Sequence, residues 1–174
     1  MRELETKRLI LRKLRSDDRE RIFSCWASDE EVTRYLTWLP HKSEEETGEI
    51  LNAWLEEYAR DDCFRFGIEL KEGQLLIGML DVVDYIGGNP EIGYVLGREY
   101  WNRGYMTEAL GAAIRYLFEE GFDCIYIRAD ERNIASNAVI RKNGFEFIKK
   151  ETGPCSRFKP EPVTCNYYRL KKDR

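Results

Sequence analysis

The chain has 174 residues, of which 43% are hydrophobic and 34% are charged, and its formal net charge is −4. This composition is typical of a globular protein with a sizeable core, and the acidic balance argues against a nucleic-acid partner, which usually needs a basic face. No apolar run approaches the ~20 residues of a membrane-spanning helix, and the charged N-terminus lacks the apolar core of a signal peptide. We therefore expect a cytoplasmic protein without a membrane partner.

The five cysteines are scattered and include no Cys-x-x-Cys pair. We therefore expect neither a metal site nor a disulfide framework. The single histidine, His41, follows a proline in a loop, and an ordinary exposed residue is the favoured interpretation.

Alternating apolar residues and turn signals predict strands at residues 8–14, 64–70, 75–85, 91–96, 124–129, 147–150 and 164–170. Apolar residues at helical spacing predict helices after residue 16, over residues 30–36, after Ser43, over residues 107–120 and over residues 133–143. Hairpin signals dominate the middle of the chain, and no repeat or linker divides it. We predict one α+β domain over residues 1–174, built on a mixed, mostly antiparallel sheet of about seven strands.

Residues 91–109 carry the most informative pattern, because an apolar strand runs through a short turn containing Gly104 directly into a helix. The first turn of a helix leaves N–H groups without partners, and these groups attract anions together with the helix dipole. Gly104 lets a phosphate approach the backbone, and Arg103 adds a positive charge. The spacing matches neither a P-loop nor a dinucleotide fingerprint. The residues alone therefore predict a candidate phosphate site, although most turns of this kind bind nothing.

This stretch resembles the coenzyme A loop of the GNAT acetyltransferases. Within that superfamily, the Glu-Ile-Gly-Tyr run at residues 91–94 and the Tyr-Trp-Asn-Arg-Gly-Tyr run at residues 100–105 resemble the RimJ/RimL-type subfamily, the ribosomal-protein N-terminal acetyltransferase-like group. The likeness covers nearly the whole chain, in order. Trp101 and Met106 depart from the superfamily's loop pattern, which leaves the contribution of those two side chains open. Further matching segments are residues 6–12, 76–80, 133–137, 142–145 and 168–170.

The resemblance implies a GNAT fold with helices on both faces of the sheet and acetyl-CoA as the cosubstrate, with no metal. The strand at residues 91–96 is expected to splay from the strand at 124–129 and to bind the pantetheine arm through its backbone, as an added strand would. The side chains of Val95 and Leu96 then belong to the core, and Asn133 also suits a helix N-cap. The implied coenzyme-binding residues are Tyr94, Val95, Leu96, Asn102, Arg103, Gly104, Tyr105, Met106, Thr107 and Asn133.

The resemblance also implies direct attack of an amine on the thioester in a ternary complex. A backbone N–H near Leu96 is the expected donor to the thioester carbonyl. Ser136 is the candidate acid for the departing thiolate, because Ile140 stands where many relatives have a tyrosine. Glu91 is the first candidate for the base, acting through water. Asp81 and Asp84 come next, with a structural role favoured for both.

The predicted reaction is transfer of acetyl from acetyl-CoA to a primary amine, either a protein N-terminus or a small-molecule amine. The competing hypothesis is a non-catalytic acyl-CoA-binding sensor or regulatory module. Dimers are common in this fold, so a homodimer is an open possibility that no residue demonstrates.

Overall fold

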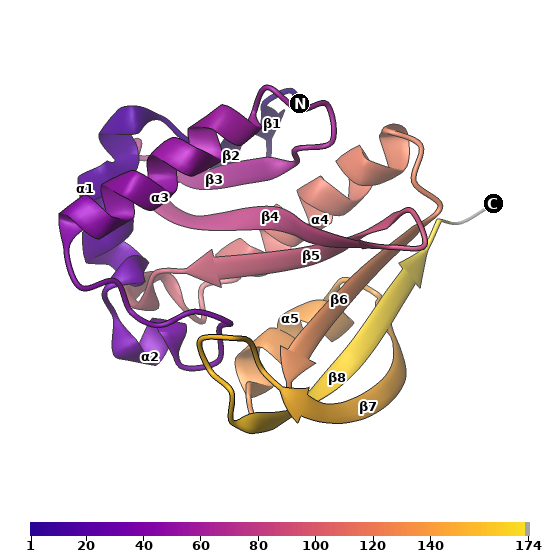
Figure 1. Ribbon diagram of the computed structural model, residues 1–174. Helices are drawn as coiled ribbons and strands as arrows, with labels where there is room; N and C mark the ends of the chain where they lie inside the picture. The colour runs from indigo at the N-terminus through magenta and orange to yellow at the C-terminus, as the bar shows by residue number, and fades with distance from the viewer. Residues whose placement is uncertain (173–174) are drawn as a thin grey trace.

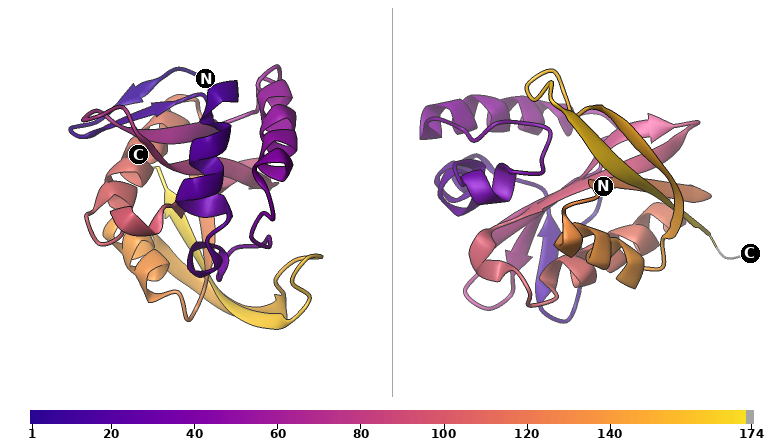
Figure 2. Two further views of the ribbon diagram at one scale, coloured as in Figure 1. Left: turned by 90° about the vertical axis from the view of Figure 1, so that its left-hand side faces the viewer. Right: turned by 90° about the horizontal axis from the view of Figure 1, so that it is seen from below.

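The computed structural model describes residues 1–172, which form one eight-stranded sheet with helices on both faces (Figures 1 and 2). The strand order is β1-β2-β3-β4-β5-β6-β8-β7, and every neighbouring pair is antiparallel except β5 and β6, which are parallel. The α+β prediction is therefore confirmed. The strands are β1 (Leu4–Glu5), β2 (Leu9–Arg12), β3 (Arg65–Leu70), β4 (Leu76–Ile86), β5 (Asn89–Leu96), β6 (Cys124–Asp130), β7 (Glu146–Pro154) and β8 (Pro162–Lys171).

The helices begin where the sequence supplies side chains that accept hydrogen bonds from their first turns. Ser43 caps α3 by accepting from the Glu46 N–H at 3.3 Å, and Asn133 caps α5 by accepting from the Ser136 N–H at 3.1 Å. The helices α1 and α4 are exceptions, because Asp18 makes no side-chain hydrogen bond to the first turn of α1 and Gly104 has no side chain to cap α4. The helices are α1 (Arg19–Ile22), continued by a π-helical turn (Phe23–Ala27), α2 (Glu30–Thr33), α3 (Glu44–Glu57), α4 (Tyr105–Glu119) and α5 (Ile134–Lys142).

Two apolar cores lie on opposite faces of the sheet, one beneath α1 and α3 and the other beneath α4 and α5. Figure 2 shows these helices on the two faces. Alternation along β5 places Val95 against α1 and α3, and Leu96 against α4. Both side chains are buried, as expected for core residues. Trp26 and Leu51 are almost fully buried on the first face, and Leu110 is fully buried on the second. Helices therefore pack on both faces of the sheet, and this packing fixes the position of β5.

The structure adds one strand to those expected and corrects the expectation for His41. The sheet has eight strands because Leu4–Glu5 pairs with β2, and a two-residue strand is too short to show alternation. His41 is also not exposed: it is 9% accessible, and its Nδ1 lies 2.8 Å from Thr47 Oγ1. Burial lowers the pKa of this imidazole, so it is a neutral packing residue at pH 7. Among residues 1–172, no helix is both long and apolar enough to cross a membrane.

Candidate active site

The two central strands separate partway along their length. The strands β5 and β6 pair only at Glu91 with Tyr126 and at Ile92 with Ile127, although β5 continues to Leu96 and β6 to Asp130. Beyond this point β6 keeps pairing with β8, while β5 keeps pairing with β4. The backbone of residues 93–96 therefore has no strand partner on the side that faces β6. A buried backbone without a partner favours an extended ligand that replaces the missing strand.

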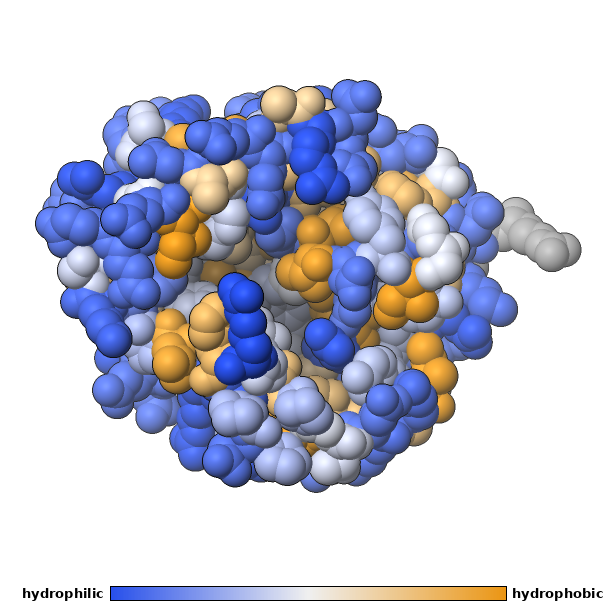
Figure 3. Space-filling model, viewed as in Figure 1, coloured by the Kyte–Doolittle hydropathy of each residue, from blue (hydrophilic) through white to orange (hydrophobic). Residues whose placement is uncertain are grey.

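A cleft of about 800 Å³ opens at this separation, and the space-filling view is hollowed at its centre (Figure 3). One wall comes from β4 and β5, a second from β6 and α5, and the segment at residues 35–38 closes a third side. The lining includes five carboxylates against one arginine, Arg128, together with aromatic side chains. The carboxylates are Asp81, Asp84, Glu91, Asp130 and Glu151, and the tyrosines and tryptophans are Tyr35, Trp38, Trp54, Tyr94 and Tyr167.

The turn between β5 and α4 presents free backbone donors. Asn102 and Gly104 both have a positive φ, of 59° and 76° respectively, and residues 101–104 are exposed. Within residues 1–172, no hydrogen bond joins the N–H groups of residues 102–107 to another protein atom. These donors sit at the N-terminus of the 15-residue helix α4, whose dipole favours an anion there. The geometry suits a diphosphate.

Arg8, which sequence reasoning missed, contacts this turn although it lies about 95 residues earlier in the chain. Its Nη1 donates to the Arg103 carbonyl at 2.9 Å, and its guanidinium lies 4.3 Å from the centre of the Tyr105 ring. A Cβ built on Gly104 would come within 3.5 Å of Arg8 Nη2. Two arginines, Arg8 and Arg103, therefore flank the free N–H groups, although nothing in the sequence places residue 8 beside residue 104.

Glu108 holds this arrangement in place. Its carboxylate accepts from Thr6 Oγ1 at 2.7 Å, from the Arg8 N–H at 2.8 Å and from Arg8 Nε at 2.7 Å. Partial burial opposes ionisation, but the hydrogen bonds from Thr6 and Arg8 outweigh it and lower the pKa of Glu108 below 4.5. These contacts give Glu108 a structural role.

The substitution Glu108→Gln should lower the free energy of unfolding by about 2 kcal/mol at pH 7, because it weakens charge-assisted hydrogen bonds. The depressed pKa means that this stabilisation is present above the ordinary pKa of 4.5 and is lost as the pH falls below it. Urea unfolding at pH 7 and pH 4 measures both effects. The control is Glu119→Gln on the same helix, whose partner Arg2 is exposed, and it should change stability by less than about 0.5 kcal/mol. Equal losses in the two variants would contradict the assigned role.

Ser136 lies on the first turn of α5, where its side chain meets β5 from the opposite wall of the cleft. Its Oγ is 2.8 Å from the hydroxyl oxygen of Tyr94. Asn133 accepts a hydrogen bond from the Ser136 N–H, so its N-cap role is observed, and its side chain also lines the cleft. Ile140 is fully buried.

Glu91 is 4% accessible at the closed end of the strand gap, and its Oε1 lies 3.1 Å from Arg128 Nε. Burial raises the pKa of Glu91, and Arg128 opposes that rise. Asp81 is bound by Arg65 through Nε at 3.0 Å, yet burial still raises its pKa to about 6. Asp84 accepts from the Tyr85 N–H at 2.8 Å. The two aspartates thus have structural partners, as expected, while also lining the cleft.

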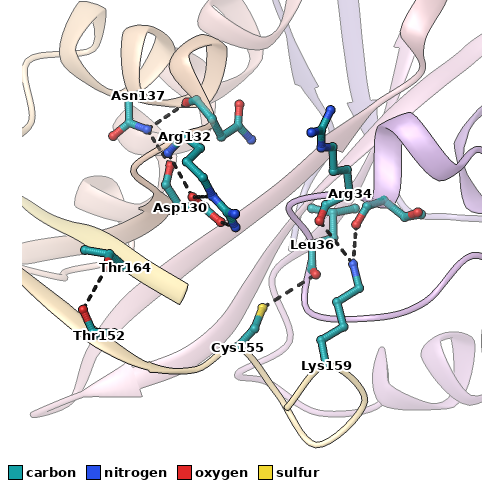
Figure 4. A network of polar contacts seen from close by, with 11 residues as sticks. Arg34, Leu36, Asp130, Arg132, Asn137, Thr152, Cys155, Lys159 and Thr164 are labelled. Carbon is teal, nitrogen blue, oxygen red and sulfur yellow. Dashed lines mark hydrogen bonds and ion pairs between the residues drawn. The ribbon is translucent and has the colours of Figure 1, made fainter. Parts of the chain in front are cut away.

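The loop that joins β7 and β8 reaches across the cleft mouth to the segment after α2 (Figure 4). Lys159 Nζ donates to the Thr33 carbonyl at 2.6 Å, and Cys155 Sγ lies 3.8 Å from the Leu36 carbonyl oxygen. Ser156 Oγ donates to the Thr37 carbonyl. This strap, residues 155–159, closes one side of the cleft.

The structure brings Glu91, Tyr94, Val95, Asn133 and Ser136 together in the cleft. Leu96 and residues 102–107 do not line it; they lie at the end of β5 and on the turn that follows. Leu96 contributes its carbonyl to Trp101, whose indole Nε1 donates to it at 2.8 Å. Sequence reasoning missed the side-chain contact of Tyr94, the pairing of Glu91 with Arg128, and the strap at residues 155–159.

Comparison with known proteins identifies the family to which the chain belongs. The model of the acetyltransferase (GNAT) domain family matches residues 8–146. YoaA of Bacillus subtilis (strain 168), described as an uncharacterized N-acetyltransferase, is 33% identical over 146 residues, which cover 82% of each chain. The chain therefore belongs to the GNAT acetyltransferase family, as the sequence motifs predicted, and it is an acetyltransferase.

Solved structures agree with this assignment. A GNAT-family acetyltransferase from Bacillus anthracis superposes with a TM-score of 0.84 at 26% identity, covering 98% of both chains. RimL, a ribosomal alpha-N-protein acetyltransferase in complex with coenzyme A, superposes with a TM-score of 0.83 at 21% identity, covering 99% of both chains. At that identity the likeness to RimL establishes a shared fold.

Proposed function

We propose that the protein is an N-acetyltransferase that moves an acetyl group from acetyl-CoA to a primary amine by direct attack in a ternary complex. The observation that carries this proposal is the gap between β5 and β6, with the free N–H groups of the α4 turn at one end and Glu91 at the other. A long, thin coenzyme with a diphosphate at one end and a thioester at the other fits that arrangement. RimL, with the same fold, is described in complex with coenzyme A.

In this proposal the coenzyme contacts are mainly to the backbone. The N–H groups of residues 102–107 bind the diphosphate, and Arg103 adds charge. The backbone of Tyr94, Val95 and Leu96, which has no strand partner on the side facing β6, binds the pantetheine amides, with the Leu96 carbonyl held by Trp101. Asn133 offers its amide from the opposite wall. Because these contacts use main-chain atoms, the departures from the family pattern at Trp101 and Met106 are compatible with binding.

The same residues account for the chemistry. An attacking amine must be neutral, whereas a free α-amino group has a pKa of about 8 and a lysine about 10.4. Glu91 takes the proton that the amine loses, through water, and an N–H near Leu96 stabilises the negative charge that grows on the thioester oxygen. Ser136 gives a proton to the sulfur as the carbon–sulfur bond breaks. No covalent enzyme intermediate is needed.

The substitution Glu91→Gln should remove the acid limb of the pH–rate profile and lower kcat by a factor of about 10² or more. Since burial raises the pKa of Glu91, this limb should lie above 4.5 in the wild-type protein, with activity falling as the pH drops through it. Rates measured from pH 5 to 9 test this. The comparison variant is Asp81→Asn: if it abolishes the limb and Glu91→Gln leaves it in place, Asp81 is the base.

For the acceptor, we propose a protein N-terminus or a small-molecule amine. Asp84, a carboxylate of the cleft lining that pairs with no lysine or arginine of residues 1–172, supports a cationic group on the acceptor, since an amine is mostly protonated before it binds. The named activity of RimL supports a protein N-terminus. We further propose that residues 1–174 form one N-acetyltransferase domain. We still predict a cytoplasmic location, no nucleic-acid or membrane partner, and a homodimer.

An acceptor screen tests the proposed function. A peptide with an N-terminal serine, spermidine and an aminoglycoside should be tried with acetyl-CoA, and at least one should be acetylated. Loss of the thioester should be followed by its absorbance, because the five cysteines are free thiols and would react with a thiol reagent. Coenzyme binding without turnover on any acceptor would support the sensor instead.

A further inference from the structure

The side chain of Tyr94 links the two walls of the strand gap. Tyr94 comes two residues after Ile92, the last residue of β5 that pairs with β6. Its hydroxyl crosses to α5 on the opposite wall, where it lies 2.8 Å from Ser136 Oγ and 3.2 Å from the Ser136 carbonyl oxygen. The strand that is proposed to bind pantetheine and the helix that carries the candidate acid are therefore joined through one hydroxyl.

These distances allow two arrangements, because each hydroxyl has one hydrogen to donate. In the first, Ser136 donates to Tyr94 and Tyr94 donates to the Ser136 carbonyl, so the serine hydrogen is already used. In the second, Tyr94 donates to Ser136 Oγ, and the serine hydrogen is free to point into the cleft. Only the second arrangement lets Ser136 protonate a departing thiolate.

We infer that Tyr94 is a positioning residue for the acetyl transfer, donating its hydrogen bond to Ser136 Oγ and so directing the serine hydrogen at the coenzyme sulfur. This inference rests on the proposed function. As the carbon–sulfur bond breaks, its electron pair goes to sulfur and the proton of Ser136 follows. The Tyr94 hydrogen stays on tyrosine and hydrogen-bonds the serine oxygen. The amine loses one proton to Glu91 and solvent, and solvent returns one to Ser136.

The surroundings of Tyr94 suit a permanent donor. Burial raises the pKa of Tyr94 well above its ordinary value of 10. The phenol therefore keeps its hydrogen at neutral pH and does not titrate during turnover. A donor that is fixed in place before the reaction needs no rearrangement when charge develops on the serine oxygen.

A purely structural tie between β5 and α5 would behave differently, and a double-mutant cycle separates the two. The variants are Tyr94→Phe, Ser136→Ala and the pair, assayed with acetyl-CoA and the fastest acceptor of the three in the screen. Tyr94→Phe keeps the ring and should lower kcat about tenfold, while changing KM for acetyl-CoA less than about twofold. In the Ser136→Ala background it should have no further effect, because the hydroxyl that it orients is gone.

Tyr168→Phe is the matched control. The Tyr168 hydroxyl donates to Asn137 Oδ1 at 2.7 Å, so this variant loses a buried hydrogen bond to the same helix without touching Ser136. It should lower the melting temperature as much as Tyr94→Phe does, and leave kcat unchanged. An unchanged kcat in Tyr94→Phe, or an equal loss with and without Ser136, would overturn the inference alone. No turnover by the wild-type protein on any acceptor would overturn the proposed function as well.

Discussion

Replacing Gly104 by leucine is expected to weaken coenzyme A binding about a hundredfold. A leucine side chain at this position would project into the space above the free N–H groups and hold the diphosphate away from them. Losing one or two charge-assisted hydrogen bonds of 1.5–3 kcal/mol each corresponds to a change in Kd of about that size. The protein itself offers room, since the nearest atom to a new Cβ would be Arg8 Nη2 at 3.5 Å. Calorimetric titration with coenzyme A measures the effect.

Backbone strain must be separated from loss of the site. Gly104 has a φ of 76°, which costs any other residue roughly 1–2 kcal/mol. Gly121, at the opposite end of α4, has a φ of 100° and nothing within 4 Å of a new Cβ. Gly121→Leu should therefore lose similar stability and keep full coenzyme affinity. If both variants bind coenzyme A as the wild type does, the diphosphate lies elsewhere.

The substitution Ser136→Ala should have the second large effect, lowering kcat by a factor of about 10² to 10⁴, as expected for loss of a general acid. The departing thiolate would then take its proton from solvent. Coenzyme affinity should change less than about twofold, because the proposed diphosphate and pantetheine contacts come from other residues. Steady-state kinetics with an acceptor from the screen, together with a coenzyme A titration, separate the two quantities.

Conservative replacement sharpens the Ser136 experiment. Ser136→Thr retains a hydroxyl and should recover a large part of the lost rate. The thiol of Ser136→Cys is larger and more acidic than the serine hydroxyl, and its bond to Cβ is longer. A kcat that is unchanged in Ser136→Ala would remove Ser136 from the chemistry and leave it as a small residue that permits close packing. A parallel loss of kcat and affinity would instead show that the serine binds the coenzyme.

Much of the fold follows from local sequence patterns. Alternation within residues 64–96 predicts three strands, and the helical spacing of Leu110 and Leu117 predicts a helix, without reference to the rest of the chain. The edge strand Leu4–Glu5 could not be predicted this way, because two residues carry no period. The burial of His41 could not be predicted either, because it depends on Thr47 and Trp38 packing around one loop.

The candidate site divides in the same manner. The turn at Gly104 was predictable, because strand, glycine and helix are consecutive in the sequence and the anion site is a property of that local geometry. Arg8 beside Arg103, and Tyr94 beside Ser136, were not predictable, because each contact joins segments that the sheet brings together. The motifs thus identified residues that could bind the coenzyme or take part in catalysis, and tertiary packing determined which of their side chains are in contact.

The most direct test of the coenzyme site is to follow the backbone amides themselves. A nitrogen-15-labelled sample titrated with coenzyme A should show its largest amide shifts at residues 102–107 and residues 94–96, with the amide of Gly121 unmoved. Saturable shifts confined to other segments, with those amides unchanged, would contradict the binding of a diphosphate at the α4 turn and the mechanism built on it.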